Sequence, residues 1–164
     1  MSTTLNPLLM PGSVVQVIRT QTTAVITSTG TYSSIDAPTP SGGTLLMFAS
    51  ITPKLSTSIL LVNALAMFGH NENSMMSIIL FRDAGSSAVA AMALNPNPGN
   101  TFNTVMPQAL SYSAISGSPS ATTFTLRGGS SDGSIWSMNG AASGVVFYTG
   151  GIVSASLTIT EIAA

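Results

Sequence analysis

Glycine and proline interrupt this chain at short intervals, and their spacing limits what it can fold into more than any other feature. There are 15 Gly and 9 Pro in 164 residues, and both residue types weaken or break a helix interior. The segments between them are rich in Thr, Val and Ile, whose branched side chains fit the pleated surface of a sheet. Short strands between turn clusters are typical of a sandwich or barrel. We therefore predict an all-β fold, most economically a jelly-roll-like antiparallel β-sandwich.

About nine or ten strands are expected, with no internal repeat and no composition shift that would mark a second domain. We expect one β-sandwich domain over residues 13–164, preceded by an N-terminal arm over residues 1–12. The last strand shows the alternation of apolar and polar residues that a half-buried strand requires. The segments expected to be extended are Ser13–Gln21, Thr23–Thr29, Tyr32–Ile35, Thr44–Ile51, Ser58–Phe68, Met75–Phe81, Ser87–Leu94, Thr104–Ser116, Ala121–Leu126, Ser134–Met138, Val145–Tyr148 and Ile152–Ile162.

The segment Ser58–Phe68 is apolar on both faces when written as a strand. A strand of this kind needs cover on both sides. One face would meet the core of the sandwich and the other a neighbouring subunit, for which Leu60, Val62 and Phe68 are the candidate interface residues. A buried helix is the alternative for this segment, because periodicity alone does not separate the two.

Charged residues are scarce, and their scarcity excludes several classes of protein. Only 5% of the chain is charged, against about 25% in an ordinary soluble domain, and the net charge is −1 with 25 Ser and 20 Thr supplying neutral polarity. Four cations cannot form the basic stripe of a nucleic-acid binder. The absence of Cys excludes disulfides and thiolate metal sites. A surface so poor in ions favours association with copies of itself.

No segment of the sequence predicts insertion into a membrane. The densest apolar run, Leu55–Gly69, contains Ser, Thr and Asn and is shorter than the roughly 18 to 20 apolar residues that span a bilayer. The first ten residues carry no cation ahead of their leucines, so we expect no secretory signal. The arm holds four large apolar side chains, which suit either a frayed terminus or a docking anchor. These candidate anchor residues are Leu5, Leu8, Leu9 and Met10.

The inventory of catalytic groups is thin. His70 is the only imidazole, and no G-x-S-x-G elbow accompanies it. We expect this histidine to be solvated in a loop. One His beside one carboxylate falls well short of a metal site. No phosphate loop or dinucleotide motif is present. We therefore predict no enzymatic activity, no metal and no cofactor. The acidic partners a His-based mechanism would have to draw on are Asp36, Glu72, Asp83, Asp132 and Glu161.

A few charged and aromatic residues are candidates for special roles. Arg82 and Asp83 are adjacent and form a candidate ion pair. Arg19 and Glu161 share a strand face with apolar residues, so either they point inward and need an ionic partner or they lie at frayed strand ends in solvent. Trp136 is the candidate ring for stacking on a glycan, with core packing as the alternative.

Five segments are distinctive when they are taken together: Gly12–Val17, Thr22–Tyr32, Ser50–Val62, Phe81–Asp83 and Leu157–Ala164. Together they resemble small virion structural proteins of tailed bacteriophages. The resemblance implies a trimeric β-sandwich in the virion, assembled in the host cytoplasm. Its partners would be copies of itself and phage capsid or tail proteins. Because the sequence has no long shaft before the domain, a capsid decoration or short head fibre is favoured. The alternative is a tail-fibre tip that binds a host surface glycan or receptor.

Overall fold

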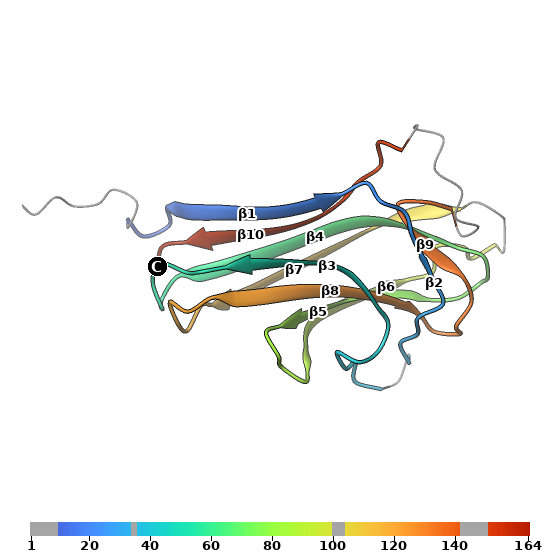
Figure 1. Ribbon diagram of the computed structural model, residues 1–164, viewed down its shortest axis with the longest axis horizontal. Helices are drawn as coiled ribbons and strands as arrows, with labels where there is room; N and C mark the ends of the chain where they lie inside the picture. Colours follow the sequence, from blue (N-terminus) through green and yellow to red (C-terminus); the bar gives the residue numbers. More distant parts are fainter. Residues whose placement is uncertain (1–9, 34–35, 100–103, 142–150) are drawn as a thin grey trace, which may run out of the picture.

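The computed structural model describes residues 10–33, 36–99, 104–141 and 151–164, and within these ranges it contains ten strands and no helix (Figure 1). Most of the strands were anticipated from the sequence, and Thr44–Ile51 has the expected bounds; Val145–Tyr148 lies outside the described residues. The strands are β1 (Val14–Thr22), β2 (Ile26–Ser28), β3 (Thr44–Ile51), β4 (Ile59–His70), β5 (Met76–Arg82), β6 (Ala88–Leu94), β7 (Val105–Ile115), β8 (Thr122–Ser130), β9 (Trp136–Met138) and β10 (Ala155–Ile162).

Strand pairing follows a nested order. β5 pairs with β6, β4 with β7, β3 with β8, β2 with β9 and β1 with β10, and every pair is antiparallel. The chain is therefore one long hairpin whose tip is the β5–β6 turn. Rolling up such a hairpin gives the jelly-roll arrangement, so the predicted all-β antiparallel sandwich is confirmed.

Rolling the hairpin produces two sheets. Sheet A has the order β1-β10-β4-β9-β2, with β7 on the other side of β4, and sheet B has the order β3-β8-β5-β6. Figure 1 shows β1, β10 and β4 side by side along one layer, with β3, β8 and β5 below them. All of the segment Ser58–Phe68 except Ser58 lies in β4 and not in a helix. This strand pairs with β7 over residues 59–69 and with β10 over residues 59–65.

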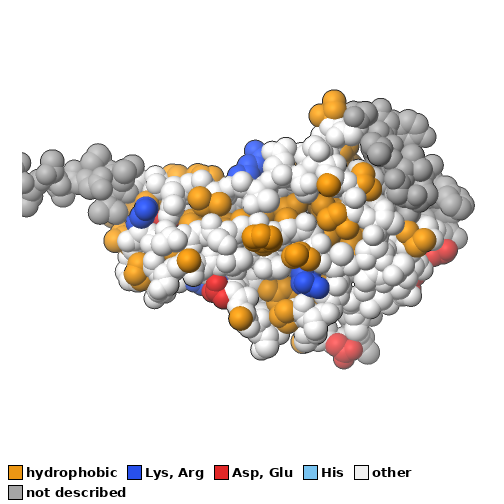
Figure 2. All heavy atoms as spheres, in the orientation of Figure 1, with side chains coloured by type: hydrophobic (Ala, Val, Ile, Leu, Met, Phe, Trp, Pro, Cys, Tyr) orange, Lys and Arg blue, Asp and Glu red, His pale blue; other side chains and the backbone are white. Residues whose placement is uncertain are grey.

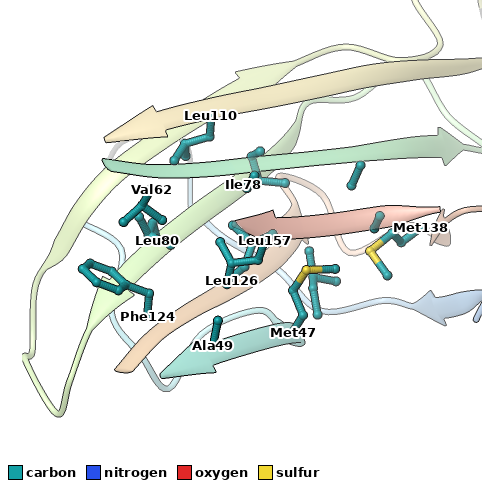
Figure 3. Close-up of a cluster of buried hydrophobic side chains, with 14 of the residues drawn as sticks. Met47, Ala49, Val62, Ile78, Leu80, Leu110, Phe124, Leu126, Met138 and Leu157 are labelled. Atoms are coloured by element: carbon teal, nitrogen blue, oxygen red, sulfur yellow. The ribbon is translucent and has the colours of Figure 1, made fainter. Parts of the chain in front are cut away.

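The core lies between the two sheets. Figure 3 shows side chains of the two sheets pointing toward one another, among them Leu157 and Val62 from sheet A and Leu126 and Phe124 from sheet B. All four are fully buried, and burying each stabilises the fold by about 1.5–3 kcal/mol.

A second, smaller cluster lies on the outer face of sheet B. It consists of Tyr32, Ile79 and Phe81, all nearly fully buried. Ile79 and Phe81 alternate along β5 with Ile78 and Leu80, which belong to the main core. Both faces of β5 are therefore covered, and the connection between β2 and β3 supplies Tyr32 as part of the cover on the outer side.

Glycines hold the Tyr32 ring in place. A Cβ built on Gly42, Gly43 or Gly129 would lie 2.8, 2.3 or 2.8 Å from ring atoms of Tyr32, so a larger residue at any of these positions would clash with the ring. Arg127 on β8 donates hydrogen bonds to the carbonyl oxygens of Gly42 at 2.8 Å and Gly43 at 3.1 Å. The β2–β3 connection therefore contacts sheet B in two ways, through the Tyr32 ring and through the hydrogen bonds that its backbone carbonyls accept from Arg127.

Candidate assembly surface

A row of four aliphatic residues crosses the outer face of sheet A. Val14 of β1 is opposite Ile162 of β10, Ile162 is opposite Ile59 of β4, and Ile59 is opposite Ile115 of β7. Val14 is 54% exposed, Ile59 39% and Ile115 64%. Residues directly opposite each other in neighbouring strands place their side chains on the same face, so these four form one apolar stripe.

Three further rows continue this face, and all but one of their residues are neutral. Among the four rows, the only charged side chain is Arg19. Four strands at about 4.8 Å and four rows at about 6.8 Å give a plane of roughly 500 Å², comparable to the roughly 800 Å² that each partner buries in a standard interface. We call this surface the assembly face. Its remaining rows are Val17, Thr160, Leu61 and Ser113; Arg19, Thr158, Asn63 and Ser111; and Gln21, Ser156, Leu65 and Ala109.

The surface of the molecule is poor in charge elsewhere too. In Figure 2, hydrophobic side chains lie among neutral polar ones over the visible face, and the few charged side chains are scattered and form no patch of one sign. No charged patch is available there for electrostatic recognition.

The interface residues predicted from the sequence on β4 are wrong, because they lie on the inner face of the strand and not on the outer one. Leu60, Val62 and Phe68 are all 0% exposed and belong to the core between the sheets. Both parities of β4 are apolar, so alternation alone did not identify the inner face. Asn63 was the available signal, because it lies on the same parity as Ile59 and is exposed on the assembly face.

The arm joins the domain beside the aliphatic row. The Gly12 N–H donates to the Ala163 carbonyl at 2.7 Å, and the Ala163 N–H donates to the Ser13 carbonyl at 2.9 Å. Met10 is 65% exposed. The other candidate anchors, Leu5, Leu8 and Leu9, lie outside the described residues, so the anchoring role stays a prediction.

The Arg82–Asp83 ion pair is present at the end of β5. The Arg82 Nε lies 3.7 Å from Asp83 Oδ2, and the Thr122 hydroxyl lies between them, donating to Asp83 at 2.7 Å and accepting from Arg82 at 3.2 Å. Arg82 also donates to the backbone carbonyls of Ile115 and Ser116. The pair therefore joins the ends of β5, β7 and β8.

Arg19 and Glu161 have different surroundings. Arg19 is exposed on the assembly face, so its inward orientation is wrong. It faces solvent from within β1, where it is opposite Thr158, and not from a frayed strand end. Glu161 is fully buried, as the inward reading required. Its expected ionic partner is wrong, however. Among the described residues its carboxylate accepts hydrogen bonds from Gln16 Nε2 at 2.6 Å and from the Lys54 and Leu55 backbone N–H groups at 2.8 and 3.4 Å, and no ion pair involves it.

These hydrogen bonds set the ionisation of Glu161. Burial by itself raises the pKa of a carboxyl group. Hydrogen bonds from Gln16, Lys54 and Leu55, with the nearby Ser58 hydroxyl, outweigh that effect and bring the pKa of Glu161 below its ordinary value of 4.5. The group is therefore a buried carboxylate stabilised by neutral donors.

His70 is buried, not solvated. It is the last residue of β4 and is 0% exposed, because the short β9 pairs with the end of β4 and extends the sheet. Its Nδ1 lies 3.0 Å from the Glu72 nitrogen and 2.9 Å from the Glu72 carbonyl oxygen, and its Nε2 lies 3.6 Å from Asp132 Oδ1. Both ring nitrogens are thus directed at the main chain or a carboxylate, which is not the orientation of a base serving a serine nucleophile.

Asp132 is held by the turn that follows β8. Burial raises the pKa of Asp132, but hydrogen bonds from the Ser134 backbone and hydroxyl, with the nearby His70 and Ser74, lower it below its usual value overall. Among the residues that the structure places, no three His, Asp or Glu side chains gather closely enough to hold a metal ion.

Trp136 is a core residue, so its proposed ligand contact is wrong. The side chain is 0% exposed, its Nε1 donates to the Gly30 carbonyl at 3.0 Å, and its ring meets Phe68 edge-on with centroids 6.1 Å apart. The core-packing alternative is the one the structure shows.

Sequence reasoning missed a groove of about 400 Å³ on the outer face of sheet B. Its floor comes from β5 and β6 and one wall from the β2–β3 connection. No sequence signal marked it, because its walls come together only when that connection folds over the sheet. The lining residues are Tyr32, Ser33, Asp36, Pro38, Met75, Ser77, Ile79, Ala91, Met92, Ala93 and Ser131.

In the described part of the chain there is no helix with the length and apolar character needed to cross a membrane.

Comparison with known proteins leaves the family open. No family model and no curated protein matches the sequence. Among solved structures, infectious bursal disease virus (Gt strain) matches with 16% identity and a TM-score of 0.44, covering 93% of this chain and 39% of that chain. The T13 particle of the same virus matches with 15% identity and a TM-score of 0.42, covering 100% and 40%.

A third structure, a Bacillus endospore appendage described as a disulfide-linked pilus, matches with 11% identity and a TM-score of 0.30, covering 94% of this chain and 95% of that chain. This chain spans about two fifths of the length of the viral chains. All three TM-scores are below 0.5, so none of these similarities assigns a function to this chain.

Proposed function

We propose that this chain is a non-enzymatic structural protein of a bacteriophage virion, a trimeric capsid decoration or short head fibre attached to the particle surface. The observation that carries the proposal is the assembly face, on which four strands of sheet A present aliphatic, hydroxyl and amide side chains with Arg19 as the only charged one. Jelly-roll sandwiches serve as viral capsid domains and also as lectins, so the fold agrees with this role without requiring it. The trimeric state and the phage particle come from the sequence resemblance.

The work of such a protein is mechanical. Trimers that are joined through the assembly face and attached across boundaries between capsid subunits add contact area that has to be broken before those subunits separate. The contacts are aliphatic packing and hydroxyl hydrogen bonds, which ionic strength screens little. The burial of Trp136 in the core removes the ring that would have supported the glycan-binding alternative.

Charge substitution on the assembly face tests this proposal. Ile115→Lys places a cation in the aliphatic row, and we expect analytical ultracentrifugation at micromolar concentration to show that it dissociates the trimer while circular dichroism stays unchanged. Ile152→Lys is the matched control, because Ile152 is 78% exposed and lies outside the face. A wild-type protein that sediments as a stable monomer would refute the proposal, as would equal effects of the two substitutions.

Attachment to the particle is tested separately. Electron microscopy of particles that carry a labelled copy should place the label on the capsid, and deletion of residues 1–11 should abolish attachment while the trimer persists. Label found only on the tail would favour the fibre-tip alternative. Attachment that survives the deletion would remove the anchoring role from the arm.

A further inference from the structure

The strand β6 forms an open edge of sheet B. It pairs with β5 alone, and in the described part of the structure no other hydrogen bond reaches its backbone. Its sequence, AVAAMAL, contains no charge and no proline, and Ala91, Met92 and Ala93 are exposed. Soluble proteins usually block such an edge with lysine, proline or a covering loop because its free N–H and C=O groups bind other strands.

The opposite edge of the same sheet is blocked. The Thr20 hydroxyl donates to the Phe48 carbonyl of β3 at 3.0 Å, and Gln16 Nε2 donates to the Thr52 carbonyl just beyond β3 at 2.8 Å. Side chains of β1 therefore occupy acceptors along this edge. Among the described residues no side-chain hydrogen bond of this kind reaches the β6 backbone, although β6 runs beside β7 of sheet A.

The groove on the outer face of sheet B runs beside the open edge. Ala91, Met92 and Ala93 belong both to the exposed part of β6 and to the groove lining. A strand that paired with β6 would extend the floor of the groove and place alternate side chains on the groove side, which is the usual arrangement in strand addition.

We propose that β6 pairs with β6 of a second copy across a two-fold axis, so that sheet B continues from one copy into the next. An antiparallel edge is self-complementary, because residues related by the axis exchange the same N–H and C=O groups. The strand carries no charge, so the two-fold brings no like charges together. Alanine at Ala91 and Ala93 allows close approach of the two backbones. This contact is separate from the assembly face and does not rest on the proposed virion role.

The axis makes a specific geometric prediction. If the outer faces of the two copies of sheet B are to be continuous, the axis is normal to the sheet and passes beside one residue of β6. That residue lies directly opposite its own copy, with Cα atoms about 4.5–5.5 Å apart, which is within the range for a disulfide. The chain has no cysteine, so a single introduced cysteine reports on this pair without interference.

Cysteine scanning tests the proposal. Single cysteines are placed at each residue from 89 to 93, and the oxidised proteins at micromolar concentration are separated on denaturing gels. We expect one position to give a covalent dimer at least tenfold faster than the others, and two variants with cysteines on either side of it to cross-link when mixed. Ser86→Cys, in the exposed turn before β6, is the control and should stay monomeric on the gel. Uniform cross-linking, or none, would overturn the proposal.

A second measurement does not depend on disulfide chemistry. Ala91→Lys should leave far-ultraviolet circular dichroism unchanged, because the side chain is exposed, and should accelerate hydrogen exchange of the outward β6 amides at least tenfold. Ser86→Lys adds the same charge off the edge and should leave that exchange unchanged. Wild-type β6 amides that already exchange at the rate of the Ala91→Lys variant would contradict the paired edge. Both readouts concern β6 alone. A negative result for β6 pairing therefore leaves the assembly face untested, and a negative result for the assembly face leaves the β6 pairing intact.

Discussion

Replacing Glu161 by glutamine removes the charge from the buried carboxylate while keeping its shape. Its oxygens accept hydrogen bonds from Gln16 Nε2 and from the Lys54 and Leu55 N–H groups. In Glu161→Gln the remaining oxygen can still serve the backbone donors, but the new NH₂ group faces the Gln16 amide. Rotating Gln16 to present its oxygen would give up its 2.8 Å bond to the Thr52 carbonyl. One hydrogen bond to a charged group is lost in either arrangement, and we expect a destabilisation of about 1.5–3 kcal/mol.

The pH dependence distinguishes this explanation from a general packing defect. The pKa of Glu161 in the folded protein is below the ordinary value of 4.5, so the carboxylate contributes stability that is present above about pH 4.5 and is lost as the pH falls through the folded pKa. Urea unfolding should therefore show a constant difference in the free energy of unfolding between wild type and Glu161→Gln near neutral pH. The gap should narrow below pH 4.5, where the protonated wild-type side chain resembles glutamine.

The control and the refuting result are both well defined. Glu72→Gln makes the same chemical change at an exposed residue and should alter stability by less than about 0.5 kcal/mol. A Glu161→Gln gap that is equally small at neutral pH would show that the neutral donors do not stabilise the carboxylate. A gap that persists unchanged at about pH 3 would show that charge is not its cause.

Three further predictions concern packing, solvent access and ionic strength. Gly43→Ala should destabilise the fold by about 3 kcal/mol or more in urea titration, because the added Cβ meets the Tyr32 ring. The control is Gly117→Ala, which has a similar positive φ but lies in open space, and it should lose only about 1–2 kcal/mol of stability. Equal losses of stability in the two variants would show that the ring contact contributes nothing. Fluorescence of Trp136, the only tryptophan, should be shielded from iodide in the folded protein and unchanged by added glycans; ready quenching would contradict its burial. Assemblies formed through the assembly face should survive about 1 M NaCl in sedimentation experiments; dissociation by salt would indicate ionic contacts instead.

The fold was predictable because alternation and turn chemistry are local. Thr44–Ile51 and most of the other strands follow from apolar runs bounded by Gly, Pro and polar turns. The inner face of β4 did not follow, because both of its parities are apolar. His70 lies in a sequence that reads as a loop, and only pairing with a strand more than sixty residues later buries it. The donors around Glu161 are likewise more than a hundred residues away in sequence. Contacts of this range leave no pattern in a single sequence.

The nested order of the hairpin also dictates when the molecule can finish folding. β10 lies between β1 and β4, so the middle of sheet A stays unfilled until residues 155–162 have left the ribosome. Pairing the first strand with the tenth closes a loop of nearly the whole domain, and long-range closure of this kind is slow. Until β10 pairs with its own β1 and β4, two completed copies can each lend the other its β10, which fills both sheets with exchanged strands. Slow closure of this long-range pairing would therefore favour intertwined dimers over correctly closed monomers.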